Sequence, residues 1–245
     1  MSPLLPFLFF VTAVLYSMVG LGGGSTYLAL LALFSFSYAS MPQVSLMCNI
    51  IVVVGGVWFF WKSGYVRWRL ILPFVITSIP AAYWGGHVTI SKKIFSLLLG
   101  VSLLVAALRM LLGEIQKTKT PFDLKKIFLW ALPMGAGLGF LSGVVGIGGG
   151  IYLAPLLILM GWADSKEAAA ASSVFILLNS LSGLAGQYLK VGSFYSIQEI
   201  LPLLIAVWMG GQIGSRIGSQ YISKLVIQRV GACLVFFAAA RLLMI

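Results

Sequence analysis

Long apolar runs separated by short polar stretches make up most of the sequence. The runs cover residues 3–36, 41–61, 70–88, 94–112, 127–161, 165–189, 197–217 and 225–245. A helix that crosses the hydrocarbon core of a bilayer needs roughly 20 mostly apolar residues, which is the scale of these runs. The pattern therefore predicts an all-α integral membrane protein whose polar stretches lie at the two membrane surfaces.

Two of these runs are too long for one straight span. As a continuous helix, residues 3–36 would extend roughly 50 Å, whereas the hydrocarbon core is about 30 Å thick. The glycine clusters Gly20–Gly24 and Gly146–Gly150 interrupt this run and run 127–161. Consecutive glycines are poor helix formers and permit positive φ. Each long run is therefore predicted to be a broken, tilted span or a re-entrant hairpin of two half-helices.

The glycine clusters are part of a longer internal repeat. Landmarks recur in the same order in the second half of the chain: Gly20–Gly24 with Gly146–Gly150, Gly55 and Gly64 with Gly183 and Gly192, Pro73 and Gly85 with Pro202 and Gly214, and Gly100 with Gly231. Such collinear self-similarity indicates a duplicated unit. We expect a first membrane repeat at 1–112, a polar connecting loop at 113–126 and a second membrane repeat at 127–245.

The conformation of the broken runs decides how the two halves are oriented. If both runs cross the membrane, the halves are parallel, and if both re-enter, the halves are inverted. Lys and Arg concentrate on the cytoplasmic side. The re-entrant arrangement gathers more of the 16 Lys and Arg residues on the side of loops 62–69 and 109–126. We therefore expect inverted repeats, as in many secondary transporters, with fully crossing runs as the alternative.

Composition and charge fit a membrane protein better than a nucleic-acid-binding one. The 245 residues are 60% hydrophobic and 9% charged, with a net charge of +11. In a soluble protein such a charge would indicate nucleic acid. Here the basic residues lie between apolar runs, as in 62–69, where they orient the chain and contact anionic lipid. The expected partners are membrane lipid and a small solute, with no nucleic acid, and a homo-oligomer is an open possibility.

The two glycine breaks are the first candidates for a solute site. Unwound backbone is tolerated in a bilayer only where it is buried in protein or lines a wet cavity. New helices starting near Ser25 and Ile151 would offer free N–H groups and a positive dipole end to an anion. The candidate substrate-binding residues are Gly22, Gly23, Gly24, Ser25, Gly148, Gly149 and Gly150. The alternative is that these glycines only allow close helix packing.

Polar side chains within the apolar runs are the second group of candidates. Ser45, Ser172 and Ser173 could hydrogen-bond the oxygens of an anion, and Ser45 and Ser173 are paired in the repeat. Hydrogen bonding between helices would explain them equally well. We expect Asn49 and Asn179 to be packing residues rather than solute ligands.

Charged residues add one candidate and exclude several functions. Arg216 follows a segment of small residues that could let it face inward as a further substrate-binding residue. The five acidic residues all fall at loop or end positions: Glu114, Asp123, Asp164, Glu167 and Glu199. This placement argues against a proton relay and a metal-cation path. We find no catalytic set, and predict no enzyme activity, no metal and no cofactor.

The motifs resemble those of the TauE/SafE family of sulfite exporters, also called toluene sulfonate uptake permeases. The resemblance covers essentially the whole chain and rests on Gly143–Gly150 with Pro155, Ala168–Ser173, the weaker copy Gly20–Gly24, and the basic-glycine turns at 62–64 and 190–192. The first half departs from the pattern because it has Ala29 or Leu30 in place of a proline and Met41–Gln43 in place of the alanine-rich run.

The resemblance implies a permease for sulfite, an organosulfonate or a related sulfur-containing anion in a prokaryotic inner membrane. It leaves the direction, export or uptake, undetermined. The chain has no P-loop lysine motif, so secondary transport driven by a gradient is expected. The alternatives are a transporter of another small solute, such as a carboxylate or a metal cation, and a non-transporting membrane subunit.

Overall fold

The helices follow the predicted apolar runs closely. The computed structural model describes residues 3–37, 40–88, 104, 108, 124–191 and 196–243. Its elements are α1 (Leu4–Met18), α2 (Gly24–Leu33), α3 (Met41–Lys62), α4 (Trp68–His87), α6 (Leu124–Val145), α7 (Gly150–Leu159), α8 (Ser165–Val191), α9 (Ile197–Arg216), η1 (Ile217–Tyr221) and α10 (Lys224–Leu243). No strand occurs within the described residues, and the predicted all-α class is confirmed.

Some predicted segments fall outside this part of the chain. The apolar run 94–112 lies outside the described residues except for Leu104 and Leu108, and so does most of the polar loop 113–126. The last residues expected in that loop, 124–126, instead open α6.

Four of the described helical segments are long and apolar enough to cross a membrane: Met41–Lys62, Phe128–Val145, Ser165–Leu189 and Ile197–Tyr221. Many large apolar side chains remain exposed on the outer helix faces, among them Trp58, Ile76, Trp84, Leu201 and Trp208. Exposed apolar surface on this scale requires an apolar surrounding. These outer faces therefore fit the apolar interior of a membrane.

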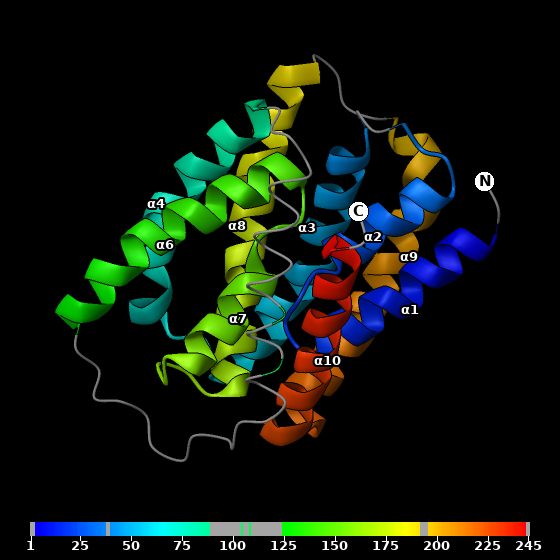
Figure 1. Cartoon of the computed structure of the whole chain (residues 1–245). Coiled ribbons are helices and arrows are strands. Elements are labelled where there is room, and N and C mark those ends of the chain that lie inside the picture. Colours follow the sequence, from blue (N-terminus) through cyan, green and yellow to red (C-terminus); the bar gives the residue numbers. More distant parts are fainter. Residues whose placement is uncertain are drawn as a thin grey trace.

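Two antiparallel helices, α3 and α8, form the centre of the bundle (Figure 1). Near one end, a Cβ on Gly56 of α3 would lie 2.9 Å from Ser173 Oγ of α8. Near the other end, a Cβ on Gly183 of α8 would lie 3.6 Å from Leu46 of α3. The residue numbers run in opposite senses along the contact, so the two helices point in opposite directions.

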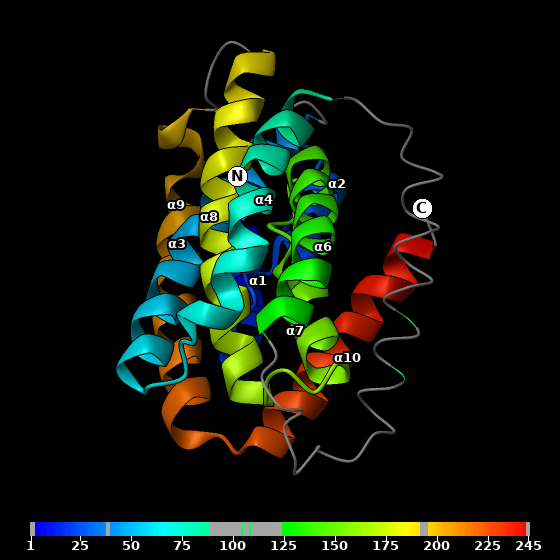
Figure 2. The same ribbon diagram turned by 90° about the vertical axis from the view of Figure 1, so that its left-hand side faces the viewer.

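Helix pairs flank this centre on both sides, and each pair is joined through small residues. Helix α4 packs on α6, and Gly135, Gly139 and Gly143 of α6 lie against Phe74, Ser78 and Ala82. Helix α1 packs on α9 and η1, and Gly210, Gly214 and Gly218 lie against Phe10, Val14 and Met18. Small residues let helix backbones approach closely in a membrane. The helices in each pair run parallel, because the residue numbers rise together along both contacts. Figure 2 shows α10 leaning away from this arrangement.

The broken runs fold back as hairpins. In α3 and α9, a Cβ on Gly211 would lie 2.9 Å from Val52 Cα, and one on Gly55 would lie 2.7 Å from Gln212. Helix α3 is therefore parallel to α9, and α9 is parallel to α1. Because α1 and α3 point the same way, the chain must return between them, and α2 makes this return (Figure 1).

The second broken run has the same course. Helix α8 is parallel to α4, since Ser182 bonds the carbonyl of Ile79 and Gly186 lies against Tyr83. Helix α6 is also parallel to α4, so α7 makes the return between α6 and α8. Both returns begin at glycines with positive φ, namely Gly20, Gly23, Gly146, Gly148 and Gly149. The half-helices begin at Gly24 and Gly150, one residue before the predicted starts.

Candidate functional site

The two glycine breaks meet beside the N-terminal half of α3. Ser45 Oγ lies 2.8 Å from the carbonyl oxygen of Gly146 and 3.2 Å from that of Gly24. One turn further along α3, Asn49 Nδ2 donates to the carbonyl of Ile147 at 3.0 Å. A Cβ on Gly24 would lie only 2.8 Å from that same carbonyl oxygen. The unwound segments, far apart in sequence, are thus in direct contact.

Helix α8 repeats this arrangement from its own side. Ser173 Oγ donates to the carbonyls of Gly20 at 3.1 Å and Ala169 at 3.0 Å. Each of the paired serines, Ser45 and Ser173, therefore bonds the first glycine of the opposite break, Gly146 or Gly20. Since a hydroxyl has one proton, each serine already uses it in these bonds to backbone carbonyls. Toward a solute they can act as acceptors only, unless these bonds open.

The starts of α2 and α7 carry unpaired backbone donors. Among the residues that the structure describes, no acceptor is found for the N–H groups of Gly22–Ser25 or of Ile147–Ile151. The first turns begin with Thr26 donating to Gly23 and Tyr152 donating to Gly149. A buried unpaired N–H group is costly, and the start of a helix carries a positive partial charge. Two positively polarised helix ends therefore lie close together with their donors free.

Buried polar side chains without partners surround the start of α7. Asn49 Oδ1, Ser142 Oγ and Ser180 Oγ have no hydrogen-bond partner among the described residues, and all three residues are fully buried. A Cβ on Gly148 would lie 3.0 Å from both Ser180 Oγ and Asn49 Nδ2, and one on Gly149 would lie 3.2 Å from Ser142 Cβ. These side chains border the unwound segment, and the hydroxyls of Ser142 and Ser180 could act as further donors to a bound solute, whereas Asn49 Oδ1 can only accept.

The described carboxylates lie away from the breaks. Asp164 and Glu167 are at the start of α8, and Glu199 is exposed at the start of α9. Glu114 and Asp123 lie outside the described residues. Within the described chain, no group of three or more His, Cys, Asp or Glu residues comes together to hold a metal ion. The local charge around the breaks comes from backbone dipoles, which favour an anion over a cation.

The structure places Ser172 beside the second break and Arg216 away from both breaks. Ser172 is buried at the second break, and its carbonyl oxygen lies 3.0 Å from the position of a Cβ on Gly150. Arg216 is exposed at the end of α9, because Gly211, Gly214 and Ser215 occupy the face of α9 that packs on the bundle. The structure therefore does not bring Arg216 to the breaks, contrary to the inward placement expected from its small neighbours.

Asparagine placement also differs between the two halves. Asn49, expected to be a packing residue, lies between the breaks. Asn179 donates to the carbonyl of Phe175 in its own helix at 2.8 Å. Sequence reasoning did not single out Ser142 or Ser180. Ser142 is one helical turn before Gly146, and this short spacing is the signal that could have identified it.

The breaks are closely packed in this arrangement. Gly22 lies against the Asn49 side chain, and a Cβ on Gly24 would lie 2.6 Å from Asn49 Nδ2. A Cβ on Gly150 would meet the side chain of Ile176. Since even a methyl group has no room at these positions, a solute can reach the free N–H groups only after the segments around them move apart. The structure is closed around the breaks.

Comparisons with known proteins agree on a transporter family. The family profile described as sulfite exporter TauE/SafE matches residues 5–242. The chain is similar to the probable membrane transporter protein y4hK of Sinorhizobium fredii, with 35% identity over 238 residues, which cover 96% of this chain and 95% of the relative.

Two further relatives come from an archaeon and a plant. The probable membrane transporter protein MJ0441 of Methanocaldococcus jannaschii is 27% identical over 241 residues, covering 91% of this chain and 88% of the relative. Sulfite exporter TauE/SafE family protein 1 of Arabidopsis thaliana is 31% identical over 108 residues, covering 44% of this chain and 22% of the relative.

Proposed function

Because the chain belongs to the sulfite exporter TauE/SafE family of membrane transporters, we propose that it carries a small sulfur-containing oxyanion by secondary transport. Sulfite and organosulfonates are the solutes that fit this proposal, in either the export or the uptake direction. The proposed setting is a prokaryotic inner membrane. The site is the pair of glycine breaks together with the residues on α3, α6 and α8 that border them.

The convergence of the two helix starts is the observation that carries this proposal. The unpaired N–H groups of Gly22–Ser25 and Ile147–Ile151 come from two different segments that touch each other. Sulfite and sulfonate groups each present three oxygens on one sulfur, so one ion can accept hydrogen bonds from both segments. Each helix end contributes roughly 0.3–1 kcal/mol toward an anion when exposed and up to about 2 kcal/mol when partly buried. Such modest binding suits a carrier that must release its solute.

The orientation of the elements supports a carrier rather than a static assembly. We propose that the two halves are inverted repeats related through the antiparallel α3 and α8. Transporters of this kind bind a solute between their halves and expose it alternately to the two membrane faces. The close packing around Gly22, Gly24 and Gly150 fits a closed state of such a carrier.

Ligand-dependent stability of the purified protein tests the proposal. A solute that binds only the folded state raises its stability by about 2.7 kcal/mol at a hundredfold excess over Kd. A thermal-shift screen of sulfite, thiosulfate, sulfoacetate, taurine and sulfate should find at least one stabilising oxyanion, while sodium chloride at matched ionic strength should not. If none of these solutes stabilises the protein, the proposal is wrong.

Asn49→Asp provides the matched variant, because it changes charge with little change in shape. The new carboxylate would lie between the two breaks and repel an anion. We expect the stabilisation by the oxyanion to be lost in Asn49→Asp and retained in Asn179→Ala, which removes an amide that bonds only its own helix. Equal stabilisation of Asn49→Asp and the wild type would contradict the proposed site.

A further inference from the structure

Lys166 is a buried cation near the start of α8. The residue is 7% exposed, and its Nζ donates one hydrogen bond, of 3.0 Å, to the carbonyl of Ser219 in η1. The ammonium also lies 5.2 Å from the ring centroid of Tyr65. An ammonium carries three donors. Within the described part of the chain it has no carboxylate partner and no second acceptor, so the positive charge is not compensated.

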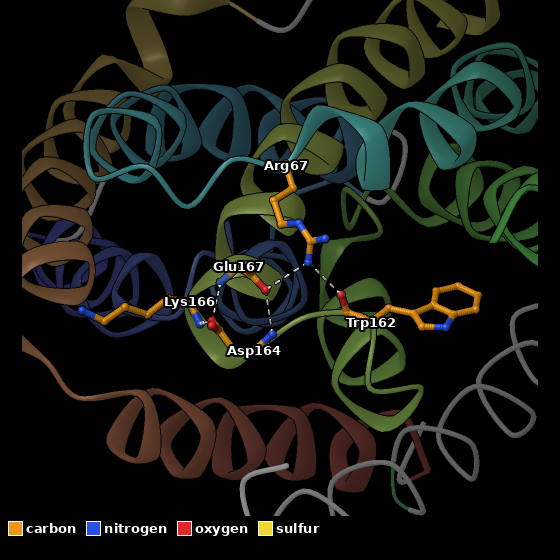
Figure 3. Close-up of polar contacts among 5 residues, drawn as sticks. All are labelled: Arg67, Trp162, Asp164, Lys166 and Glu167. Carbon is orange, nitrogen blue, oxygen red and sulfur yellow. Dashed lines mark hydrogen bonds and ion pairs between the residues drawn. The ribbon is translucent and has the colours of Figure 1, made fainter. Parts of the chain in front are cut away.

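The nearby acidic side chains make other contacts (Figure 3). Glu167 Oε2 pairs with Arg67 Nη1 at 3.5 Å and accepts the Asp164 N–H at 3.1 Å. Asp164 Oδ1 accepts the N–H groups of Lys166 and Glu167, each at 3.0 Å, which completes a capping box at the start of α8. Figure 3 shows the Lys166 side chain extending away from these acidic groups. Their proximity in sequence therefore does not neutralise it.

Lys166 precedes the contact between α8 and the first glycine break by about one to two helical turns. Three residues further along α8, Ala169 packs against Gly20. Seven residues along, Ser173 donates to the Gly20 carbonyl. At about 1.5 Å per residue, the ammonium-bearing residue is roughly 10 Å along the helix axis from this contact.

Polar groups of α9 and η1 lie between Lys166 and the contact of Ser173 with Gly20. Ser215 precedes Ser219 by one helical turn, and its Oγ is buried without a partner. A Cβ on Gly56 would lie 2.9 Å from Ser173 Oγ and 3.4 Å from Ser215 Oγ. Polar side chains of α8 and α9 thus lead from the Lys166 ammonium toward the break.

We propose that Lys166 forms a second anion-binding site, where a small oxyanion pauses between the membrane surface and the glycine breaks. The inference rests on the proposed function and adds a residue and a location to it. Burying an uncompensated ammonium is expensive, and a bound anion would compensate it. A hydrogen bond between an ammonium and an anion is stronger than one between an ammonium and a neutral carbonyl, so an arriving anion would compete with the Ser219 carbonyl that holds the ammonium when no anion is present.

The site lies at the end of the bundle where α3 ends and where α4 and α8 begin, here called the basic face. Lys62, Arg67, Arg69 and Lys166 are all at this end. Anions approaching from this side would meet Lys166 before the breaks. Loss of the ammonium should therefore affect entry from the basic face more than entry from the opposite face.

Transport of radiolabelled sulfite into right-side-out and inside-out vesicles tests this site. We expect Lys166→Gln to raise the KM for entry from the basic face about tenfold and to change entry from the other face by less than threefold. Lys166→Arg should recover much of the loss. Lys62→Gln, which removes an exposed charge from the same end, should behave like the wild type and controls for general surface attraction.

The outcomes separate this inference from the proposed function. An unchanged basic-face KM in Lys166→Gln, with normal wild-type flux, would overturn the Lys166 site alone. No oxyanion flux in the wild type would overturn the proposed function and the site that rests on it. If Lys166→Gln does not fold, diffraction from wild-type crystals soaked in selenite decides the point: an anomalous peak within hydrogen-bond distance of Lys166 Nζ supports the site, and a peak confined to the breaks contradicts it.

Discussion

Gly23 and Gly149 hold the backbone in conformations that other residues rarely adopt. Their φ angles are +92° and +74°. A Cβ on Gly23 would lie 3.0 Å from Tyr27 Cζ, and one on Gly149 would lie 2.9 Å from Phe175 Cε1. A side chain at either position therefore strains the backbone and crowds an aromatic ring within the break itself.

We predict that Gly23→Val and Gly149→Val abolish sulfite transport and leave membrane insertion largely intact. The left-handed conformation alone costs a non-glycine residue roughly 1–2 kcal/mol. Two glycines that have open space around the Cβ position serve as controls. Gly137→Val tests the effect of adding a valine side chain to α6, and Gly64→Ala tests the effect of a side chain at a positive φ outside the breaks. Flux into proteoliposomes and the yield in the membrane fraction are the two measurements. Normal flux in either break variant would reduce that cluster to a packing role.

The Ser173 hydroxyl joins α8 to the first break, and its removal should be measurable. We predict that Ser173→Ala lowers the free energy of unfolding by about 0.6 kcal/mol, with an upper limit near 1.7 kcal/mol. We also expect a few-fold weaker affinity for the solute, because the Gly20 segment loses its anchor. Ser78→Ala is the control, since the buried Ser78 hydroxyl bonds only a carbonyl in its own helix. Equal effects of the two substitutions on affinity would contradict this role.

At the scale of elements, the hairpin returns at α2 and α7 require equivalent loops to lie on opposite faces. We predict that Ser63→Cys, between α3 and α4, and Ser196→Cys, between α8 and α9, react with an impermeant thiol reagent from opposite sides of the membrane. The background should carry Cys48→Ala and Cys233→Ser, which remove the native thiols. Ser37→Cys should label from the same side as Ser196→Cys. Labelling of Ser63→Cys and Ser196→Cys from one side would rule out inverted halves.

The sequence predicted the helices better than their inward faces. Run lengths and glycine clusters located α1, α2, α6 and α7, because the bilayer requires long apolar segments and the unwound positions require glycine. The side of each helix that points into the bundle is harder to predict, because lipid-exposed and protein-buried faces are both apolar in such a chain. For this reason the position of Asn49 between the two breaks and the outward position of Arg216 could not be predicted from the sequence.

Lys166 shows a second limit of prediction from sequence. It lies between Asp164 and Glu167 in a polar stretch, which is typical of a solvated helix end. Its burial depends on Tyr65 and Ser219, which are distant in the chain. Only the tertiary arrangement shows that the acidic neighbours cap the helix and that no described carboxylate pairs with the ammonium.

At the scale of the whole molecule, the interlocked helix pairs constrain how the site can open. Helix α4 packs on α6 and α1 packs on α9, so each flanking pair contains one helix from each proposed half. Access to the breaks therefore requires movement of elements of the two halves relative to each other. Contacts across α3 and α8, including those of Ser45 and Ser173, are the ones that such a movement must rearrange.

The ionisation of the solute, rather than of the protein, should set the pH dependence of transport. No described carboxylate lies at the breaks, and the nearest polar groups there are hydroxyls, an amide and backbone N–H groups. Because the sulfite dianion takes up its first proton near neutral pH and becomes a monoanion, flux of the monoanion should rise as pH falls from mildly alkaline to mildly acidic values. A transported sulfonate, whose charge stays fixed, should show a flat profile. A matching pH profile for the sulfonate would indicate a titrating group of the protein instead.

Counterflow of radiolabelled sulfite in proteoliposomes measures whether the converging helix ends of α2 and α7 serve to carry an oxyanion. Vesicles containing purified wild-type protein and loaded with unlabelled sulfite should transiently accumulate external label, whereas Asn49→Asp vesicles should not. Loading with potassium chloride in place of sulfite should abolish the accumulation. Electrogenic uptake of a cation by the wild-type protein, with no sulfite counterflow, would contradict the account.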